Sequence, residues 1–551
     1  MSTITGKQPQ ETDTTTSASM TLEQQIGQLF MVGFHGPAVT PEITELIQQH
    51  HVGGVVLFSR NIRSAEQVFA LTSELQALAR AANHPYPLLI SIDQENGMVQ
   101  RLGDAVTAFP GNMALGAVGD EAVTAEVAEA TGRELKALGI TMNLAPDADV
   151  NNNPANPVVG TRSFGANAQE VARHTAAAVR GYRAASIVSS IKHFPGHGDT
   201  ATDSHLGVPV LPFTLERLQS LEFVPFVGGI AAGADTVMIA HVALPQLMDG
   251  AATPATLSPA IIRGLLREQL GYEGVIISDC LEMEAVSETV GTPQGSVLTL
   301  QAGTDIALVS HEYTRQKESL AAVRAAVQSG ALPAEAIAQA AARVLRLKQQ
   351  RLSWETLPTE AGLREIGNAA HQQLRDQVYA RSTTLIRQEG SILPLHLDET
   401  TRILVLAQLP PSMTLAIDLA YPHESLVESI RRRHTNTHDL LLRGAADAVD
   451  NERLREEIEQ SNLIIMATIN AHTDPAQVTL MQRLLASGKR VIGLAICNPY
   501  DLAAFPQLRT YLATYEYTKP ALESAVRVLF GEAQPQGKLP VTIPGITPMA
   551  L

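Results

Sequence analysis

The sequence is poor in cysteine, because only Cys280 and Cys497 occur in 551 residues. Two lone thiols cannot form the disulfide framework that stabilises many small secreted domains, and they suit a reducing compartment. We therefore expect a cytoplasmic protein. Residues 1–20 are rich in Thr, Ser and Gln and lack the basic and apolar regions of a secretory signal, so we expect a disordered leader there.

Long apolar runs and an excess of basic side chains are also missing. No stretch reaches the roughly 18 consecutive apolar residues of a membrane-spanning helix. With 40 basic against 56 acidic side chains the formal charge is −16, which repels phosphate backbones and anionic lipid surfaces. We expect neither a nucleic-acid partner nor a membrane contact, and the sequence does not indicate an oligomeric state.

What the chain does contain is an alternation of short apolar runs with amphipathic segments. Its length exceeds the roughly 250–300 residues at which one hydrophobic core stops growing, so at least two domains are expected. The apolar runs predict strands at 54–58, 88–93, 142–145, 187–193, 236–241, 275–279 and 306–309. With helical patterns between them, these units predict a (β/α)8 barrel of the TIM type over residues 21–350.

The remainder of the chain predicts a second, smaller domain. A polar segment punctuated by Pro and Gly follows the barrel, and we assign residues 351–384 to a linker. Further apolar runs predict strands at 403–407, 463–468, 491–496 and 511–515. The expected fold class is therefore α/β, with an N-terminal barrel and a C-terminal α/β sandwich domain over residues 385–551.

Polar side chains stand at the ends of three predicted barrel strands. Asp93 follows the strand at 88–92, Lys192 and His193 end the strand that begins at 187, and Asp279 ends the strand that begins at 275. The loops that leave the carboxyl ends of the strands build the active site of a (β/α)8 barrel. We therefore expect these side chains to line one site.

The loop after Lys192 is the densest polar element, and two interpretations of it stay open. In the first, a divalent metal is held by a set of imidazoles and carboxylates, namely His193, His197 and His205 with Asp199 or Asp203. This set lacks the helical spacing that makes a zinc motif specific. In the second, which we favour, the loop supplies acid–base chemistry and sugar binding, with no metal and no cofactor.

Several motifs resemble the bacterial β-N-acetylglucosaminidases of glycoside hydrolase family 3. The motifs within the barrel are Lys192-His193-Phe194-Pro195-Gly196-His197-Gly198-Asp199-Thr200, Asp203-Ser204-His205, Ser278-Asp279, Asp93-Gln94-Glu95, Arg101-Leu102 and Thr161-Arg162-Ser163-Phe164. Near the C-terminus, Gly537-Lys538-Leu539-Pro540-Val541 is similar to the family's second domain. The resemblance implies a retaining, exo-acting enzyme of two domains that cleaves terminal GlcNAc from muropeptides or chitooligosaccharides.

The resemblance also implies roles for individual residues. Asp279 would be the nucleophile that forms a glycosyl-enzyme intermediate. His205 would be the acid and base, with Asp203 orienting its ring. Gly198 and Gly207 would flank the segment that carries His205 over the substrate.

The remaining matched residues would bind the terminal sugar. The resemblance implies that four side chains hold its hydroxyls, with a fifth close by: Asp93, Arg101, Lys192 and His193, and then Arg162. The family's usual Gly-Gly-Arg after Gln-Glu is replaced here by Asn96-Gly97-Met98, a departure that would change the preferred aglycone or acceptor.

Three alternatives remain open. The first is phosphorolysis, because an imidazole acid–base group repels phosphate less than a second carboxylate would. The second is a β-glucosidase of the same family, although those enzymes usually carry Ser-Asp-Trp where this chain has Ser278-Asp279-Cys280. The third is a non-catalytic cell-wall sugar-binding protein on the same barrel.

Overall fold

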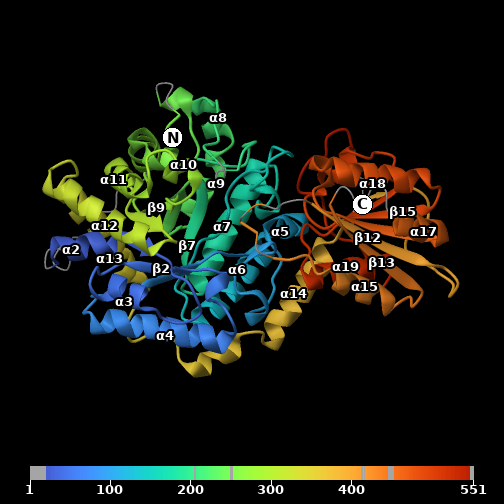
Figure 1. Cartoon of the computed structure of the whole chain (residues 1–551), viewed down its shortest axis with the longest axis horizontal. Helices are drawn as coiled ribbons and strands as arrows, with labels where there is room; N and C mark the ends of the chain where they lie inside the picture. The colour runs from blue at the N-terminus through green and yellow to red at the C-terminus, as the bar shows by residue number, and fades with distance from the viewer. Residues whose placement is uncertain are drawn as a thin grey trace, which may run out of the picture.

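The structure is a computed structural model that describes residues 20–203, 207–248, 252–410, 414, 416–417, 419–444 and 452–546. The chain forms two domains that lie side by side (Figure 1), the first coloured blue to yellow and the second orange to red. Of the predicted leader, residues 1–19 lie outside the described part of the chain.

The first domain is a closed barrel of parallel strands in the order β1-β10-β9-β8-β7-β6-β3-β2. Its strands are β1 (Phe30–Val32), β2 (Gly54–Leu57), β3 (Leu89–Ile92), β6 (Met142–Asn143), β7 (Val188–Phe194), β8 (Thr236–Ile239), β9 (Val275–Cys280) and β10 (Ile306–Val309). The predicted TIM-type barrel is therefore confirmed. β1 was missing from the predicted strands because a three-residue strand gives too short an apolar run.

Helices surround this barrel. They are α2 (Leu22–Gln28), α3 (Pro41–Gln48), α4 (Ala65–Ala81), α5 (Asn112–Val118), α6 (Glu121–Ala137), α7 (Ala168–Ala184), α8 (Leu215–Ser220), α9 (Phe223–Ala231), the π-helical η6 (Ala260–Gln269), α10 (Glu284–Ser287), α11 (Thr292–Ala302), α12 (Tyr313–Gln328) and α13 (Ala334–Arg351). Most strand residues are buried because helices cover one face of the sheet and the barrel interior covers the other. No helix of the described residues is both long and apolar enough to cross a bilayer.

The second domain is built on a six-stranded sheet in the order β11-β16-β15-β14-β12-β13, in which only β11 runs antiparallel to its neighbour. Its strands are β11 (Thr384–Gln388), β12 (Ile403–Leu409), β13 (Thr437–Arg443), β14 (Leu463–Thr468), β15 (Arg490–Ala495) and β16 (Thr510–Ala513). Its helices are α15 (His423–Arg431), α17 (Glu452–Gln460), α18 (Pro475–Ala486) and α19 (Lys519–Leu529). The predicted α/β domain is present, and β11 and β13 are strands that the apolar runs did not indicate.

The segment between the domains is more regular than the predicted linker. It contains a 3₁₀ segment, η7 (Glu360–Glu365), and a four-turn helix, α14 (Ala369–Ser382). Asn368 caps α14 by accepting a hydrogen bond from the backbone N–H of His371. α14 runs along the junction of the domains and contacts α5, α6 and α19 (Figure 1). This segment therefore packs both domains together instead of tethering them loosely.

A buried carboxylate, Glu516, joins three parts of the chain at this junction. Its Oε2 accepts a hydrogen bond from the N–H of Gly111 in the barrel domain at 2.7 Å, and its Oε1 accepts one from the hydroxyl of Tyr379 on α14 at 2.6 Å. Burial raises the pKa of Glu516 to about 7. In addition, Met113 and Ala117 of α5 pack into a hydrophobic cluster of the second domain.

Lys348 on α13 is a fully buried lysine whose two hydrogen-bond partners are neutral. Its Nζ donates to Gln28 Oε1 and to the carbonyl of Gly53, each at 2.7 Å. Burial lowers the pKa of Lys348 to about 7 because nearby low-dielectric packing disfavours the ammonium form.

We predict that replacing Lys348 by Met removes a pH dependence of stability. Between about pH 7 and pH 10 the unfolded chain binds a proton that the native amine does not, so the free energy of unfolding rises with pH by up to about 1.4 kcal/mol per unit. Urea unfolding of wild type and Lys348→Met across this range measures the difference. A constant difference at all pH values would contradict the prediction.

Candidate active site

A cavity of about 400 Å³ opens at the carboxyl ends of the barrel strands, and we refer to it as the first cavity. Six of the predicted site residues line it, namely Asp93, Arg101, Arg162, Lys192, His193 and Asp279. They come from segments as far apart as β3 and β9, and the closed parallel barrel brings them together because its strands end at one rim. The volume falls within the roughly 300–1,000 Å³ typical of small-molecule sites.

One wall of the first cavity is a network of buried charges centred on Glu95. The carboxylate of Glu95 accepts two hydrogen bonds from Arg162, at 2.9 and 2.8 Å, and lies 2.6 Å from the Nζ of Lys192. Lys192 also donates to Asp93 Oδ1 at 2.6 Å. Burial alone would raise the pKa of Glu95, but the two cations outweigh it and lower that pKa below its usual range. Both cations and the Glu95 carboxylate are therefore charged, and Asp93 is half-buried at the cavity edge.

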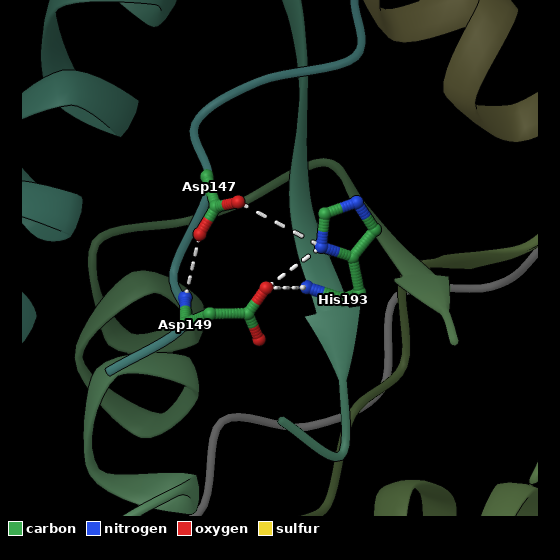
Figure 2. A group of neighbouring side chains, drawn as sticks. All are labelled: Asp147, Asp149 and His193. Atoms are coloured by element: carbon green, nitrogen blue, oxygen red, sulfur yellow. Dashed lines mark hydrogen bonds and ion pairs between the residues drawn. The ribbon is translucent and has the colours of Figure 1, made fainter. Parts of the chain in front are cut away.

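The imidazole of His193 is held by two carboxyl groups that follow β6 (Figure 2). His193 Nδ1 lies 2.7 Å from Asp149 Oδ2 and 3.8 Å from Asp147 Oδ2. Its Nε2 lies 3.3 Å from the guanidinium of Arg162. Burial and the neighbouring Asp149 charge raise the pKa of Asp147 well above its ordinary value, whereas contacts with His193 and His197 outweigh burial and lower the pKa of Asp149. His193 is thus locked in orientation from both sides of its ring.

Among the described residues, Asp147, Asp149 and His193 are the group whose ligand atoms lie close enough together, within 4.8 Å, to hold a metal ion. Both oxygens of Asp149 already accept hydrogen bonds, from His193 and from the N–H of His197 at 2.6 Å. These bonds, with the contact of His193 Nδ1 to Asp149, fix the orientation of the His193 ring.

The metal set considered from sequence is not assembled by the described part of the loop. His197 Nδ1 lies 2.8 Å from the hydroxyl of Thr200, and Asp199 pairs with Arg217 at 3.1 Å. Burial lowers the pKa of His197 to about 4, so its ring is neutral near neutral pH. His205 lies outside the described residues.

Asp279 lies near the end of β9, opposite the charge network. Its Oδ1 accepts a hydrogen bond from the N–H of Cys280 at 2.7 Å, which fixes the carboxylate close to the backbone. The register between β9 and β10 shifts at this point, and such irregularities redirect side chains at barrel rims. Cys280 itself is buried, and its Sγ lies 2.9 Å from Ser310 Oγ. Asp279 is therefore a half-buried carboxylate that a ligand in the first cavity can reach.

Asp203 is placed apart from the first cavity. It lines an adjoining second cavity of about 370 Å³, where its Oδ2 accepts a hydrogen bond from Thr414 of the second domain at 2.9 Å. The two cavities share Val158 and Arg162. Of the two glycines predicted to flank a moving segment, Gly198 is packed so tightly against Val150 that a Cβ would lie 1.8 Å from its carbonyl oxygen, whereas Gly207 faces open space.

Asn96 and Met98, which depart from the family's usual sequence, line neither cavity. Asn96 and Gly97 have positive φ in the turn of a hairpin, β4 (Gln94–Asn96) and β5 (Val99–Gln100). Asn96 donates to Thr131 Oγ1 at 3.0 Å, and Met98 packs in a hydrophobic cluster of the second domain. Asn96 thus contacts α6 of the barrel domain and Met98 contacts the second domain, and the expected effect of these departures on the aglycone stays a prediction.

Sequence reasoning did not assign Glu95, Asp147 or Asp149 to the site. Glu95 stood inside a quoted motif, and the two aspartates follow a predicted strand, so the rule of polar residues at strand ends would have found all three. Sequence reasoning also missed Arg60, which lines the first cavity and donates a hydrogen bond to the carbonyl of Ser310 at 2.7 Å. Arg60 lies within a 3₁₀ turn (Ser59–Asn61) after β2 and gives no comparable signal.

We predict that Glu95→Gln strongly destabilises the fold. The change leaves the buried cations Arg162 and Lys192 without their shared carboxylate, which costs about 3–5 kcal/mol of unfolding free energy. Glu129→Gln is the matched control, because Glu129 forms an exposed pair with Arg133 at 2.6 Å and such pairs contribute less than about 1 kcal/mol. Chemical unfolding of both variants measures the effect, and equal losses would refute the role assigned to Glu95.

Comparisons with known proteins agree with this architecture. Residues 21–347 match the Glycosyl hydrolase family 3 N terminal domain and residues 383–548 match the Glycosyl hydrolase family 3 C-terminal domain. Beta-hexosaminidase A of Pseudoalteromonas piscicida is 30% identical over 605 residues, which cover 96% of this chain and 98% of that protein.

Two solved structures are similar along the whole chain. A family 3 β-N-acetylglucosaminidase from Paenibacillus sp. str. FPU-7 is 40% identical with a TM-score of 0.88, covering 95% of this chain and 99% of that one. A fungal multi-domain family 3 β-N-acetylglucosaminidase is 44% identical with a TM-score of 0.90, and the match covers 96% of this chain but 61% of that one. The barrel and the second domain thus recur together, and the chain belongs to glycoside hydrolase family 3 as a glycoside hydrolase.

Proposed function

We propose that this enzyme is a retaining, exo-acting β-N-acetylglucosaminidase that cleaves terminal GlcNAc from muropeptides or chitooligosaccharides. The observation that carries the proposal is the position of Asp279 in the same cavity as Asp93, Lys192 and Arg162. A carboxylate beside a cluster of charged donors and acceptors is the arrangement needed to hold sugar hydroxyls and attack the anomeric carbon. The similar proteins, which are a beta-hexosaminidase and a β-N-acetylglucosaminidase, support the same substrate class.

In this mechanism Asp279 attacks the anomeric carbon, and the glycosidic bond breaks as the leaving oxygen takes up a proton. The resulting glycosyl-Asp279 ester is then hydrolysed by water, which restores the carboxylate with retention of configuration. Four side chains hold hydroxyls of the terminal ring, namely Asp93, Arg101, Lys192 and His193, and Arg162 lies close by. Because Glu95 and Asp149 fix Arg162, Lys192 and His193 in advance, binding does not have to order these side chains.

His205 supplies and later removes the proton, with Asp203 as its partner. Support for this part comes from Asp203, which lines the second cavity, and this cavity shares Val158 and Arg162 with the first. An imidazole that titrates near neutral pH suits both steps. Both cysteines are buried thiols, which suits a cytoplasmic enzyme.

We predict that Asp279→Ala lowers kcat/KM for nitrophenyl-GlcNAc by at least about 10⁴-fold, because the proposed covalent intermediate forms on the Asp279 carboxylate. His205→Ala should lower it by about 10²–10⁴-fold. Asp104→Ala is a control, because the Asp104 side chain is 97% exposed. Nitrophenol release measures all three variants, and full activity of Asp279→Ala would exclude the proposed nucleophile.

The same assay separates the alternatives. Faster turnover of nitrophenyl-glucose than of nitrophenyl-GlcNAc would identify a β-glucosidase. A sugar phosphate formed when inorganic phosphate is added would identify a phosphorylase. Binding of GlcNAc without turnover of either substrate would identify a sugar-binding protein.

A further inference from the structure

His241 is a buried histidine that the proposed mechanism does not use. It follows β8, is 0% exposed and lines neither cavity. β8 and β9 run parallel, with Ile239 paired to Ser278. Two residues further along each strand, this register places His241 beside Cys280. A histidine therefore lies next to the strand end that presents Asp279 to the first cavity.

The ring of His241 donates a hydrogen bond to the turn that follows Asp279. Its Nε2 lies 2.8 Å from the carbonyl oxygen of Cys280. Because a carbonyl oxygen only accepts hydrogen bonds, Nε2 carries the hydrogen and is the donor. The same carbonyl accepts the backbone N–H of Met283 at 3.1 Å, so two donors fix its orientation. Both Cys280 and Met283 line the first cavity.

The other ring nitrogen is anchored on a different element. Nδ1 of His241 lies 2.6 Å from Oγ1 of Thr256, in the 3₁₀ turn η5 (Ala255–Leu257). The backbone carbonyl of Thr256 accepts a hydrogen bond from the hydroxyl of Thr299 on α11 at 2.9 Å, which ties this turn to the helical layer. The ring is thus held at both nitrogens, and Nε2 cannot turn away from Cys280 without breaking the contact with Thr256.

The backbone next to Asp279 needs support of this kind. Asp279 Oδ1 accepts the N–H of Cys280 at 2.7 Å, so the orientation of the carboxylate follows the backbone of Cys280. On one side of the strand, the register between β9 and β10 shifts across this point. On the other side, the regular pairs between β8 and β9 extend as far as Ser278. The side chain of His241 supplies a bond to Cys280 beyond that last pair.

We propose that His241 is a positioning residue for the nucleophile, and that it acts by holding the Cys280 backbone to which the Asp279 carboxylate is bonded. The inference rests on the proposed function, because it takes Asp279 as the nucleophile. Displacing a reacting group by about 1 Å can lower a rate about 10²-fold. Loss of the His241 bond therefore slows attack on the anomeric carbon, whereas the side chains proposed to hold the sugar come from other segments and keep their positions.

The test uses two amide variants that each reproduce one ring nitrogen. The amide of His241→Gln reaches the position of Nε2 and can bond to Cys280, whereas the shorter amide of His241→Asn reaches the position of Nδ1 and can bond only to Thr256. His241→Asn should lower kcat for nitrophenyl-GlcNAc about 10²-fold, and the loss in His241→Gln should be at least about tenfold smaller. The dissociation constant of GlcNAc, measured by calorimetry, should change less than about threefold in both variants.

His174→Asn is the matched control. His174 is 2% exposed in the same domain, its Nδ1 lies 2.8 Å from Thr124 Oγ1, and it lines neither cavity. Its replacement should leave kcat of the folded enzyme within about twofold of wild type, even where the melting temperature falls. Equal kcat in His241→Gln and His241→Asn, or a loss of GlcNAc binding as large as the loss of kcat, would overturn the inference.

If His241→Asn does not fold, Thr256→Val provides a second test, because it removes the hydroxyl at Nδ1 and nearly keeps the side-chain volume. It should lower kcat at least about threefold with unchanged GlcNAc binding, and an unchanged kcat would overturn the inference. Full activity of Asp279→Ala would instead reject the proposed function, independently of the His241 variants.

Discussion

The ionic contacts of Glu95 with Arg162 and Lys192 are the interaction on which the rest of the site depends. They join three segments that lie far apart in the chain, namely β4, the 3₁₀ turn η3 (Gly160–Arg162) and the end of β7. Two cations and their carboxylate are stable out of water only because the geometry satisfies each of them. Once they are in place, Asp93 and His193 have fixed partners, and the wall that faces Asp279 needs no rearrangement to bind a polar ring.

The barrel and most of its rim could be predicted from the sequence, because both rest on short-range patterns. Strands buried on both faces must be apolar throughout, and polar residues directly after them must face the rim. Asp93, Lys192 and Asp279 follow this rule and share one cavity. This rule did not predict β1, because β1 has only three residues. It also did not predict β13, because β13 is an edge strand in which buried and more exposed residues alternate.

Other features depend on contacts between distant segments and carry no local signal. The ring of His193 is oriented by Asp149, which follows a different strand, and Arg60 reaches the first cavity from a 3₁₀ turn after β2. The hairpin with Asn96 and Met98 shows the same limit. Its departure from the family pattern suggested an effect on the ligand, yet Met98 packs among residues of the second domain.

Glu516 has a consequence for how the chain divides into units. Its carboxylate binds the backbone of Gly111 in one domain, the phenol of Tyr379 on α14 and the hydroxyl of Thr518 in the other domain. α5 meanwhile contributes side chains to the second domain's core. A truncated barrel that ends at Arg351 would expose the apolar face of α5 to water and leave Gly111 without its acceptor. The domain boundary expected from the sequence therefore does not divide the chain into two independently folding units. Both domains should unfold together in one cooperative transition.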